Sequence, residues 1–151
     1  MAANEKDNAK LAKESYHLFS KGDLNGLIQH FAENATFTPM PTGETLNGRN
    51  EIMGFIGNFK TAFPDMTLDI KRQVACGDNV VTEFVAKGTH KGVFKTPMGD
   101  IPATNRKVEE SLCEIVKIKD GKFVENHLYF DTASLMQQLG VSNLAEQTHS
   151  Y

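Results

Sequence analysis

Several residue types are scarce in this sequence, and their scarcity excludes whole classes of protein. It has no tryptophan, only two cysteines (Cys76 and Cys113), and apolar runs of no more than a few residues. Two cysteines build no disulfide framework and are typical of a reducing compartment. Such short apolar runs predict no membrane-spanning helix, and the polar N-terminus lacks a signal-peptide core. We therefore expect a cytoplasmic protein with no membrane partner.

Charge and motif content narrow the possibilities further. Sixteen Lys and Arg stand against nineteen Asp and Glu, giving a net charge of -3. No basic excess is available to bind a phosphate backbone, so no nucleic-acid partner is predicted. The histidines and cysteines show no metal-ligand spacing, and no phosphate-binding glycine motif occurs. The expectation is therefore no metal and no cofactor.

The composition that remains is that of an ordinary globular protein. The chain has 151 residues, of which 40% are hydrophobic and 23% charged. This length is enough for one domain with a substantial core. No repeat, linker or low-complexity tract divides the sequence. We predict a single domain over residues 1–151, with an ordered core from about 9 to 141.

Hydrophobic periodicity predicts helices first and strands afterwards. Apolar residues at helical spacing mark a helix over about 6–20, Asp23 can cap a shorter one, and the stripe from Ile52 to Phe63 marks a third helix capped by Asn50. The later segments read as strands with one terminal helix. The predicted strands are 35–38, 66–74, 80–91, 107–119 and 122–130, with a loop over 92–105 and a helix over 132–139.

This segregation of helices and strands predicts an α+β fold. A highly curved antiparallel sheet wrapped around N-terminal helices makes a cone with an interior pocket, which the loop over 92–105 is expected to close in part. One mouth of such a pocket is a natural site for a small hydrophobic molecule.

Four sequence blocks support a family resemblance. They are Ala62-Phe63-Pro64-Asp65-Met66, the segment Gly88-Thr89-His90-Lys91-Gly92-Val93-Phe94, the hairpin Lys119-Asp120-Gly121-Lys122-Phe123-Val124-Glu125, and Asp131 followed by Leu135-Met136-Gln137-Gln138-Leu139-Gly140. In this order and spacing, the sequence resembles the SnoaL-like polyketide cyclases, also called ester cyclases, of the NTF2-like superfamily. His127 stands where the family usually has tryptophan, which implies an altered pocket lining.

The resemblance implies both a fold and a chemistry. The fold would be the NTF2-like cone, commonly found as a homodimer. The chemistry would be a cofactor-free intramolecular aldol cyclisation or a ketosteroid-isomerase-like isomerisation. The resemblance assigns the acid–base role to Asp131. A carboxyl in an apolar pocket has a raised pKa, which suits proton transfer near neutral pH.

Strand alternation over 122–130 places Glu125, His127, Tyr129 and Asp131 on one face. We expect His127, Tyr129 and Asp131 in the cavity, with Asp131 and His127 catalytic. Leu128 and Phe130, on the other face, would then lie in a dimer interface. Asp131 is equally well placed to cap the terminal helix, and the two roles are compatible.

Further predictions concern binding residues. We expect five residues to contact the substrate: His90, Tyr129, Tyr16, Phe59 and Met40. A rim or capping role is the alternative for His90. Glu110 and Glu114 share a strand face, but side chains four residues apart on a strand are about 13 Å apart. That separation is too large for a carboxylate dyad, so the sequence argues against this pair.

Three functions remain open at this point. The chain is an enzyme that performs acid–base chemistry on an apolar carbonyl compound, a non-catalytic module that binds a hydrophobic metabolite, or an interaction domain whose cavity is filled by side chains. A sizeable cavity favours the first two.

Overall fold

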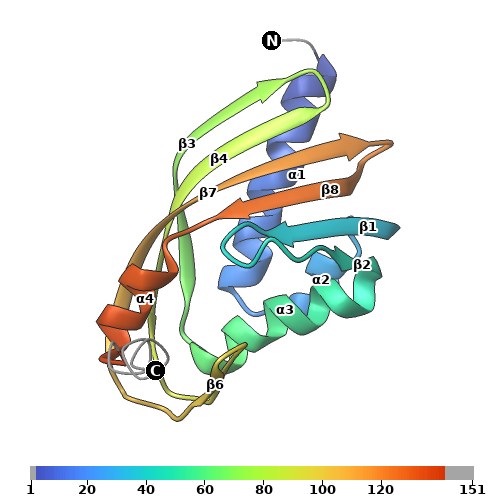
Figure 1. The fold of residues 1–151 in the computed structure, drawn as a ribbon. Coiled ribbons are helices and arrows are strands. Elements are labelled where there is room, and N and C mark those ends of the chain that lie inside the picture. Colours follow the sequence, from blue (N-terminus) through green and yellow to red (C-terminus); the bar gives the residue numbers. More distant parts are fainter. Residues whose placement is uncertain (1–2, 142–151) are drawn as a thin grey trace.

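The computed structural model describes residues 3–141, which form a curved sheet with helices packed against it (Figure 1). In chain order the elements are α1 (Ala3–Ser20), α2 (Leu24–Ile28), β1 (Phe31–Pro39), β2 (Leu46–Asn47), α3 (Gly48–Ala62), β3 (Thr67–Cys76), β4 (Asn79–Thr89), β5 (Phe94–Thr96), β6 (Gly99–Ile101), β7 (Lys107–Lys119), β8 (Lys122–Tyr129) and α4 (Thr132–Leu139). The predicted α+β class, with N-terminal helices packed on a curved sheet, is confirmed.

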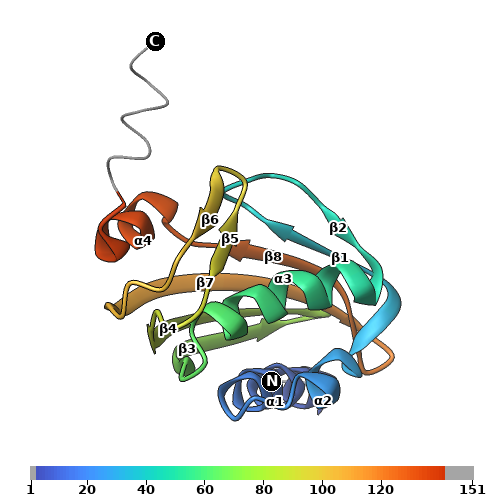
Figure 2. The same cartoon turned by 90° about the horizontal axis from the view of Figure 1, so that it is seen from below.

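The main sheet is six-stranded, with the order β2-β1-β8-β7-β4-β3. All neighbouring pairs are antiparallel except β1 and β8, which run parallel. Seen from below, α1, α2 and α3 lie on one side of this sheet (Figure 2), and α4 packs against β7. The long curved strands and these helices enclose the interior between them.

Local chemistry explains where the helices begin and end. The Asp23 carboxylate accepts a hydrogen bond of 2.9 Å from the Gly26 N–H and so caps α2. At the other end of the chain, α4 begins at its cap Asp131 and stops at Gly140, whose φ of 75° suits glycine. The α3 helix begins earlier than predicted, because Asn47 rather than Asn50 takes the N-cap position.

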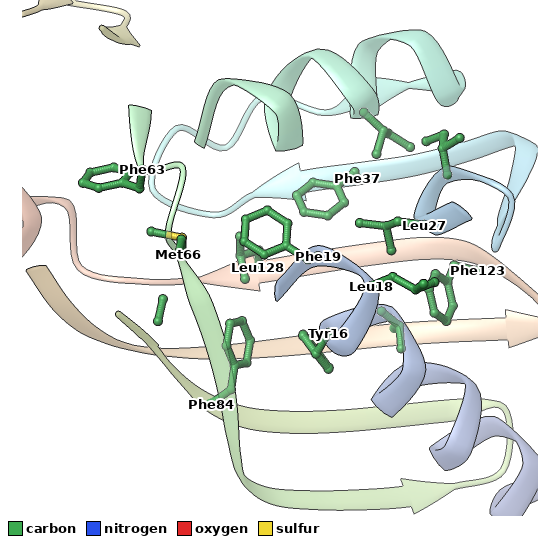
Figure 3. Close-up of a cluster of buried hydrophobic side chains, with 14 of the residues drawn as sticks. Tyr16, Leu18, Phe19, Leu27, Phe37, Phe63, Met66, Phe84, Phe123 and Leu128 are labelled. Carbon is green, nitrogen blue, oxygen red and sulfur yellow. The ribbon is translucent and has the colours of Figure 1, made fainter. Parts of the chain in front are cut away.

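The core is dominated by aromatic and aliphatic side chains that meet between α1, α3 and the sheet (Figure 3). Phe63 and Phe123 are almost fully buried, and the rings of Tyr16 and Phe84 lie 4.7 Å apart. Figure 3 shows Tyr16 and Phe19 directed from α1 toward the sheet. The residues predicted to form the helical stripes therefore face inward.

Two predicted segments differ from the structure. β1 is longer than the predicted 35–38 and pairs in parallel with β8, a long-range contact that local periodicity does not report. The predicted loop over 92–105 contains the β5–β6 hairpin. Thr96 Oγ1 donates 2.7 Å to the Gly99 carbonyl across its turn, and Phe94 anchors it on Phe59 with ring centroids 5.1 Å apart.

An irregularity in β8 decides which residues face the interior. In the β7–β8 ladder, Lys117 pairs with Glu125 and Ile118 pairs with Phe123, so Val124 is an extra residue on β8. One extra residue reverses the side-chain parity beyond it. Phe123 is buried before the bulge, and Leu128 is buried after it. The predicted division of 125–130 into two faces is confirmed, but Leu128 and Phe130, rather than His127 and Tyr129, face the interior.

Two glycines allow close backbone approach under the β5–β6 hairpin. A Cβ at Gly88 would lie 3.1 Å from the Phe63 Cβ, and one at Gly92 would lie 2.2 Å from the Thr61 carbonyl oxygen. The Gly92 N–H also donates to the Ala62 carbonyl, which ties the hairpin entrance to the end of α3. Glycine is needed at 92 because any side chain would push these two backbones apart.

We predict that Gly92→Ala destabilises the protein by about 1–3 kcal/mol, the usual cost of overpacking. The matched control is Gly54→Ala in α3, where an added Cβ meets nothing within 4 Å. That substitution should stabilise the fold by about 0.5–1 kcal/mol, because alanine has the higher helix propensity. Urea unfolding of both variants measures the difference, and equal stability of the two would contradict the close approach.

Candidate functional site

A cavity of about 120 Å³, partly open to solvent, lies between the helices and the inner face of the sheet. Every phenylalanine of the chain except Phe94 contributes to its lining. The polar side chains among the lining residues come from α1 and β7, and they are Ser15, Tyr16, Glu110 and Glu114. The Ser15 hydroxyl is turned to its own helix, where it donates 2.6 Å to the Ala12 carbonyl. Tyr16 and the two carboxyls therefore define the chemistry of this cavity.

Glu114 and Tyr16 form a hydrogen-bonded pair within this apolar surrounding. The Tyr16 hydroxyl donates to Glu114 Oε1 over 2.6 Å, a distance typical of a strong charge-assisted bond. β7 positions Glu114 between Thr82 of β4 and Leu128 of β8 in the sheet register. Tyr16 reaches it from α1, and its ring is held against Phe84. The pair thus joins α1 to the middle of the sheet.

Burial shifts the pKa of both members of the pair. Loss of hydration raises the pKa of Glu114 to about 7, and the hydrogen bond from Tyr16 opposes this rise. Burial, followed by the neighbouring Glu114 charge, raises the pKa of Tyr16 well above its usual value. Near neutral pH, Glu114 therefore exists in both protonation states, while Tyr16 keeps its proton. This is the condition for a group that takes up and releases protons.

Glu110 is the second carboxyl of the cavity, and it faces α4. Gln138 Nε2 donates to Glu110 Oε2 over 3.2 Å, and Gln138 Oε1 accepts from the Glu109 N–H over 2.8 Å. Burial raises the pKa of Glu110, and the hydroxyl of Ser134 partly offsets that rise. Glu110, Leu112 and Glu114 follow one another on the same face of β7. The cavity therefore has a carboxyl toward α1 and another toward α4.

The predicted placement of His127 and Tyr129 in the cavity is wrong. Neither belongs to its lining, because both side chains lie on the outer face of the sheet. Tyr129 is 41% exposed. His127 Nε2 lies 3.3 Å from Glu125 Oε1, and the partial exposure of both side chains makes this a weak surface pair. Leu128 and Phe130, predicted for a dimer interface, line the cavity instead.

Asp131 is exposed and does not line the cavity either. Its Oδ1 accepts a hydrogen bond of 3.1 Å from the Ser134 N–H, so the carboxylate caps α4. Of its two predicted roles, the structure places the side chain for the capping role. Asp131 and His127, the two predicted catalytic residues, both lie outside the cavity that holds Glu114.

The predicted binding residue His90 is fully buried and supports the hairpin base rather than lining the cavity. The Thr104 N–H donates to His90 Nδ1 over 3.2 Å, so the ring proton resides on Nε2. The backbone N–H of His90 also donates to the Arg106 carbonyl. Burial lowers the pKa of His90, and the carbonyls of Gly92 and Ile101 oppose this shift. His90 thus holds the 104–106 end of this segment, through its ring at Thr104 and through its backbone at Asn105 and Arg106.

Of the other three predicted binding residues, two line the cavity and one lies outside it. Tyr16 and Phe59 line the cavity. Met40 does not, because its side chain is 37% exposed at the turn after β1. The structure therefore brings Tyr16 and Phe59 together with Glu114, and leaves His90, Met40 and Tyr129 outside the lining.

Within residues 3–141, no group of three or more metal-ligating side chains comes together, and no helix has the length and apolarity needed to span a membrane. Cys76 is exposed, Cys113 is half-buried, and both are free thiols. Burial raises the pKa of Cys113, which makes its thiol less nucleophilic at neutral pH.

Glu110 and Glu114 were set aside as a pair in the sequence analysis, yet both line the cavity. They share the inner face of β7, as strand parity predicts. The actual partner of Glu114 is Tyr16, 98 residues away in sequence. An inward-facing glutamate in an apolar strand was the available signal, because a buried carboxyl requires a hydrogen-bond donor from some other element.

Comparison with known proteins identifies the family. The model of the SnoaL-like polyketide cyclases matches residues 9–139. The chain belongs to this family. No curated protein matches it. Among solved structures of the SnoaL-like fold, IdmH of Streptomyces antibioticus, a proposed polyketide cyclase, is 30% identical with a TM-score of 0.73, covering 89% of this chain and 99% of that one.

Two further structures show how widely this SnoaL-like fold is shared. AclR of Streptomyces galilaeus, a proposed hydroxylase, is 24% identical with a TM-score of 0.77 over 89% of this chain and 96% of its own. A proposed SnoaL-like polyketide cyclase from Jannaschia sp. CCS1 is 17% identical with a TM-score of 0.79, covering 94% of this chain and 96% of that one. At these identities, the likeness concerns the fold alone.

The raised pKa of Glu114 predicts a pH-dependent cost in stability. Between its ordinary value of 4.5 and about 7, the folded state holds a proton that the unfolded state has released, so stability falls as pH rises through this window. Glu114→Gln keeps an acceptor for Tyr16 and removes the ionisation. We expect the free energy of unfolding of the variant, minus that of the wild type, to be larger at pH 8 than at pH 5 by up to about 3 kcal/mol.

Urea unfolding of both proteins at the two pH values measures this change. The control is Glu109→Gln, at an exposed position whose carboxylate pairs with Lys87 over 3.3 Å. This variant should show little pH-dependent difference. A Glu114→Gln variant with the same pH profile as the wild type would contradict the buried, near-neutral carboxyl.

Proposed function

We propose that this SnoaL-like protein is an enzyme that moves protons on an apolar carbonyl compound by means of its own side chains. The observation that carries the proposal is the Glu114–Tyr16 pair, a carboxyl with a pKa of about 7 in a cavity lined by phenylalanines. A general base works best when its pKa lies near the operating pH. Membership in a family of cyclases, and likeness to the proposed cyclase IdmH, support a carbonyl substrate.

The reaction begins with proton abstraction. Ionised Glu114 removes a proton from the carbon next to the substrate carbonyl, and the electron pair of the broken C–H bond moves onto the carbonyl oxygen as an enolate. Protonated Glu114 is a weaker acceptor, so the Tyr16 hydroxyl is released to donate to the enolate oxygen. Stabilising developing charge with a preorganised donor in a dry site is the largest contribution in many enzymes.

The enolate then has two outcomes. Glu114 returns the proton to a different carbon, which completes an isomerisation. Alternatively, the enolate carbon forms a bond to a second carbonyl of the same molecule, and the proton passes to the new alkoxide, which completes an aldol cyclisation. Both routes restore ionised Glu114 and conserve every atom of the substrate.

The cavity volume limits the reacting part of the substrate. A cavity of about 150 Å³ with an apolar lining accommodates benzene, and the cavity in this protein measures about 120 Å³. One six-membered ring therefore fills the enclosed part, and any larger compound extends through the open side. Within residues 3–141 no cationic side chain lines the cavity, which favours a neutral ligand over an anionic one.

We also retain a homodimer and a cytoplasmic location as predictions. Within residues 3–141, all three N-terminal helices cover the inner side of the sheet and leave the outer side without a helical layer (Figure 2). Half-buried residues such as Val85 and Ile115 lie there beside Tyr129. We propose this outer face as the dimer interface, in place of Leu128 and Phe130. Sedimentation of the wild type and Ile115→Lys decides between a dimer and a monomer.

Catalysed exchange of protons at the carbon next to a carbonyl tests the function directly. We predict that the wild type accelerates deuterium incorporation at C2 of cyclohexanone in D₂O, with a rate that rises with pH and levels off above about 7. The rise reflects ionisation of Glu114. Glu114→Gln should reduce the catalysed rate by roughly 10²–10⁴-fold, the usual contribution of a general base. NMR follows the exchange.

Asp131→Asn is the matched control for this experiment. Asparagine caps a helix as well as aspartate does, so the fold is preserved while the carboxylate is removed. We expect unchanged exchange in this variant. Loss of exchange in Asp131→Asn, with retention in Glu114→Gln, would assign the base to Asp131. Binding of the ketone without any exchange would favour the non-catalytic binding module.

A further inference from the structure

Glu110 has no role in the proposed proton transfer, yet its carboxyl belongs to the same cavity as Glu114. Burying a carboxyl costs free energy unless hydrogen-bond donors compensate it. Gln138 supplies one donor, at Oε2, and the Ser134 hydroxyl supplies a second. A carboxylate has about four acceptor positions, so Glu110 retains acceptor capacity toward the cavity. The chain thus has a half-buried acceptor at the α4 end that the acid–base reaction leaves unused.

The spacing of the two carboxyls sets a length for a ligand that reaches both. Glu110 and Glu114 lie four residues apart on one strand, which separates them by about 13 Å along β7. The side chain between them on the same face is Leu112, and it is apolar. If each contact to a carboxyl is about 2.7 Å long and lies along this axis, the carbon whose proton Glu114 removes and the distal hydroxyl oxygen of the ligand are about 8 Å apart. Two linked six-membered rings reach that far.

The surroundings define the chemistry of each end. At the α1 end, Tyr16 donates and Glu114 accepts, which suits the reacting carbonyl and its neighbouring C–H. At the α4 end, Glu110 provides oxygen acceptors, and Leu135 of α4 completes the apolar wall. An acceptor is complemented by a ligand O–H group. A ligand lacking that group would leave the carboxyl unsatisfied, and unpaired buried groups are what make such sites selective.

We propose that Glu110 is a specificity-determining residue, and that the ligand is a slender apolar ketone with a hydroxyl group at the end remote from its reacting carbonyl. The inference rests on the proposed function for the reacting end, and it adds the recognition of the distal end. Because one ring fills the enclosed volume, the second ring extends along Leu112 toward Glu110 and α4.

Two ketones that differ by a single oxygen atom test this assignment. The probes are 4-(4-hydroxyphenyl)cyclohexanone and 4-phenylcyclohexanone, and calorimetry measures the Kd of each. The wild type should bind the hydroxylated probe about tenfold or more tightly, since a hydrogen bond to a charged acceptor supplies that ratio. Glu110→Leu should abolish the preference while leaving the affinity for 4-phenylcyclohexanone within a few fold. Glu109→Gln, on the opposite face of the same strand, should retain it.

A merely structural role for Glu110, in which its carboxyl only holds Gln138 and α4, predicts equal loss for both probes and no change in their ratio. That result would overturn the proposal. If Glu110→Leu does not fold, Glu110→Gln replaces it, because the amide preserves the shape and an acceptor for Gln138 while weakening the bond to the ligand hydroxyl. A ratio unchanged in Glu110→Gln would also count against the proposal.

The same probes separate this inference from the proposed function. Both contain the cyclohexanone C2 protons whose exchange depends on Glu114. Glu114-dependent exchange with no preference for the hydroxylated probe would refute the role of Glu110 alone. Binding with a Glu110-dependent preference but no exchange would refute the enzymatic function alone. If neither probe binds to the wild type, the proposed ligand is wrong at both ends.

Discussion

The position of one carboxyl in an apolar cavity is the constraint on which the rest of this site depends. Glu114 has lost most of its hydration, and that loss holds its pKa near 7 despite the 2.6 Å hydrogen bond from Tyr16. The packing of the surrounding aromatic core, and of α1 against the sheet, offsets the free energy that burial of Glu114 costs. The same packing of α1 positions Tyr16. A fully solvated glutamate would have no such cost and would be a weak base at neutral pH. The same burial thus reduces stability and makes proton transfer possible.

The fold places this group by combining distant parts of the chain. β7, the long strand near the centre of the sheet, presents Glu110 and Glu114 on its inner face, and its neighbours β4 and β8 close the wall around them. α1 contributes the hydroxyl that pairs with one carboxyl, and α4 contributes the amide that pairs with the other. Because the two partners come from opposite ends of the chain, the cavity exists only when the whole domain is folded.

Much of the fold could be predicted from the sequence, because its signals were local. Strand 107–119, the hairpin at Asp120-Gly121, and the helix over 132–139 follow from alternation, turn chemistry and capping. Which face of β8 turns inward left no comparable signal. Alternation grouped the residues of β8 correctly, but their polarity and the family resemblance assigned His127 and Tyr129 to the cavity, and the structure places them on the outer face. The polar side chains that line the cavity come from α1 and β7.

The site was harder to predict than the fold for a physical reason. Spacing along one strand was enough to exclude a Glu110–Glu114 dyad, but it could not reveal a tyrosine 98 residues away that completes the site. For Asp131, the sequence allowed two roles equally, an acid–base group or the N-cap of α4. The hydrogen bond that its carboxylate accepts from the Ser134 N–H shows the capping geometry. The sequence blocks were enough to predict the family, and the family match confirms it. The proposed acid–base pair could be identified only from the structure.

The most direct test is a measurement of the pKa of Glu114. Carboxyl-carbon NMR across pH gives this value, and Glu114→Gln assigns the resonance. The account predicts a value of about 7, and a higher value still in Tyr16→Phe, because the hydrogen bond that favours the charged form is lost. A value at or below the ordinary 4.5 would show a solvated carboxylate and would contradict the assignment of Glu114 as the proton-transfer group.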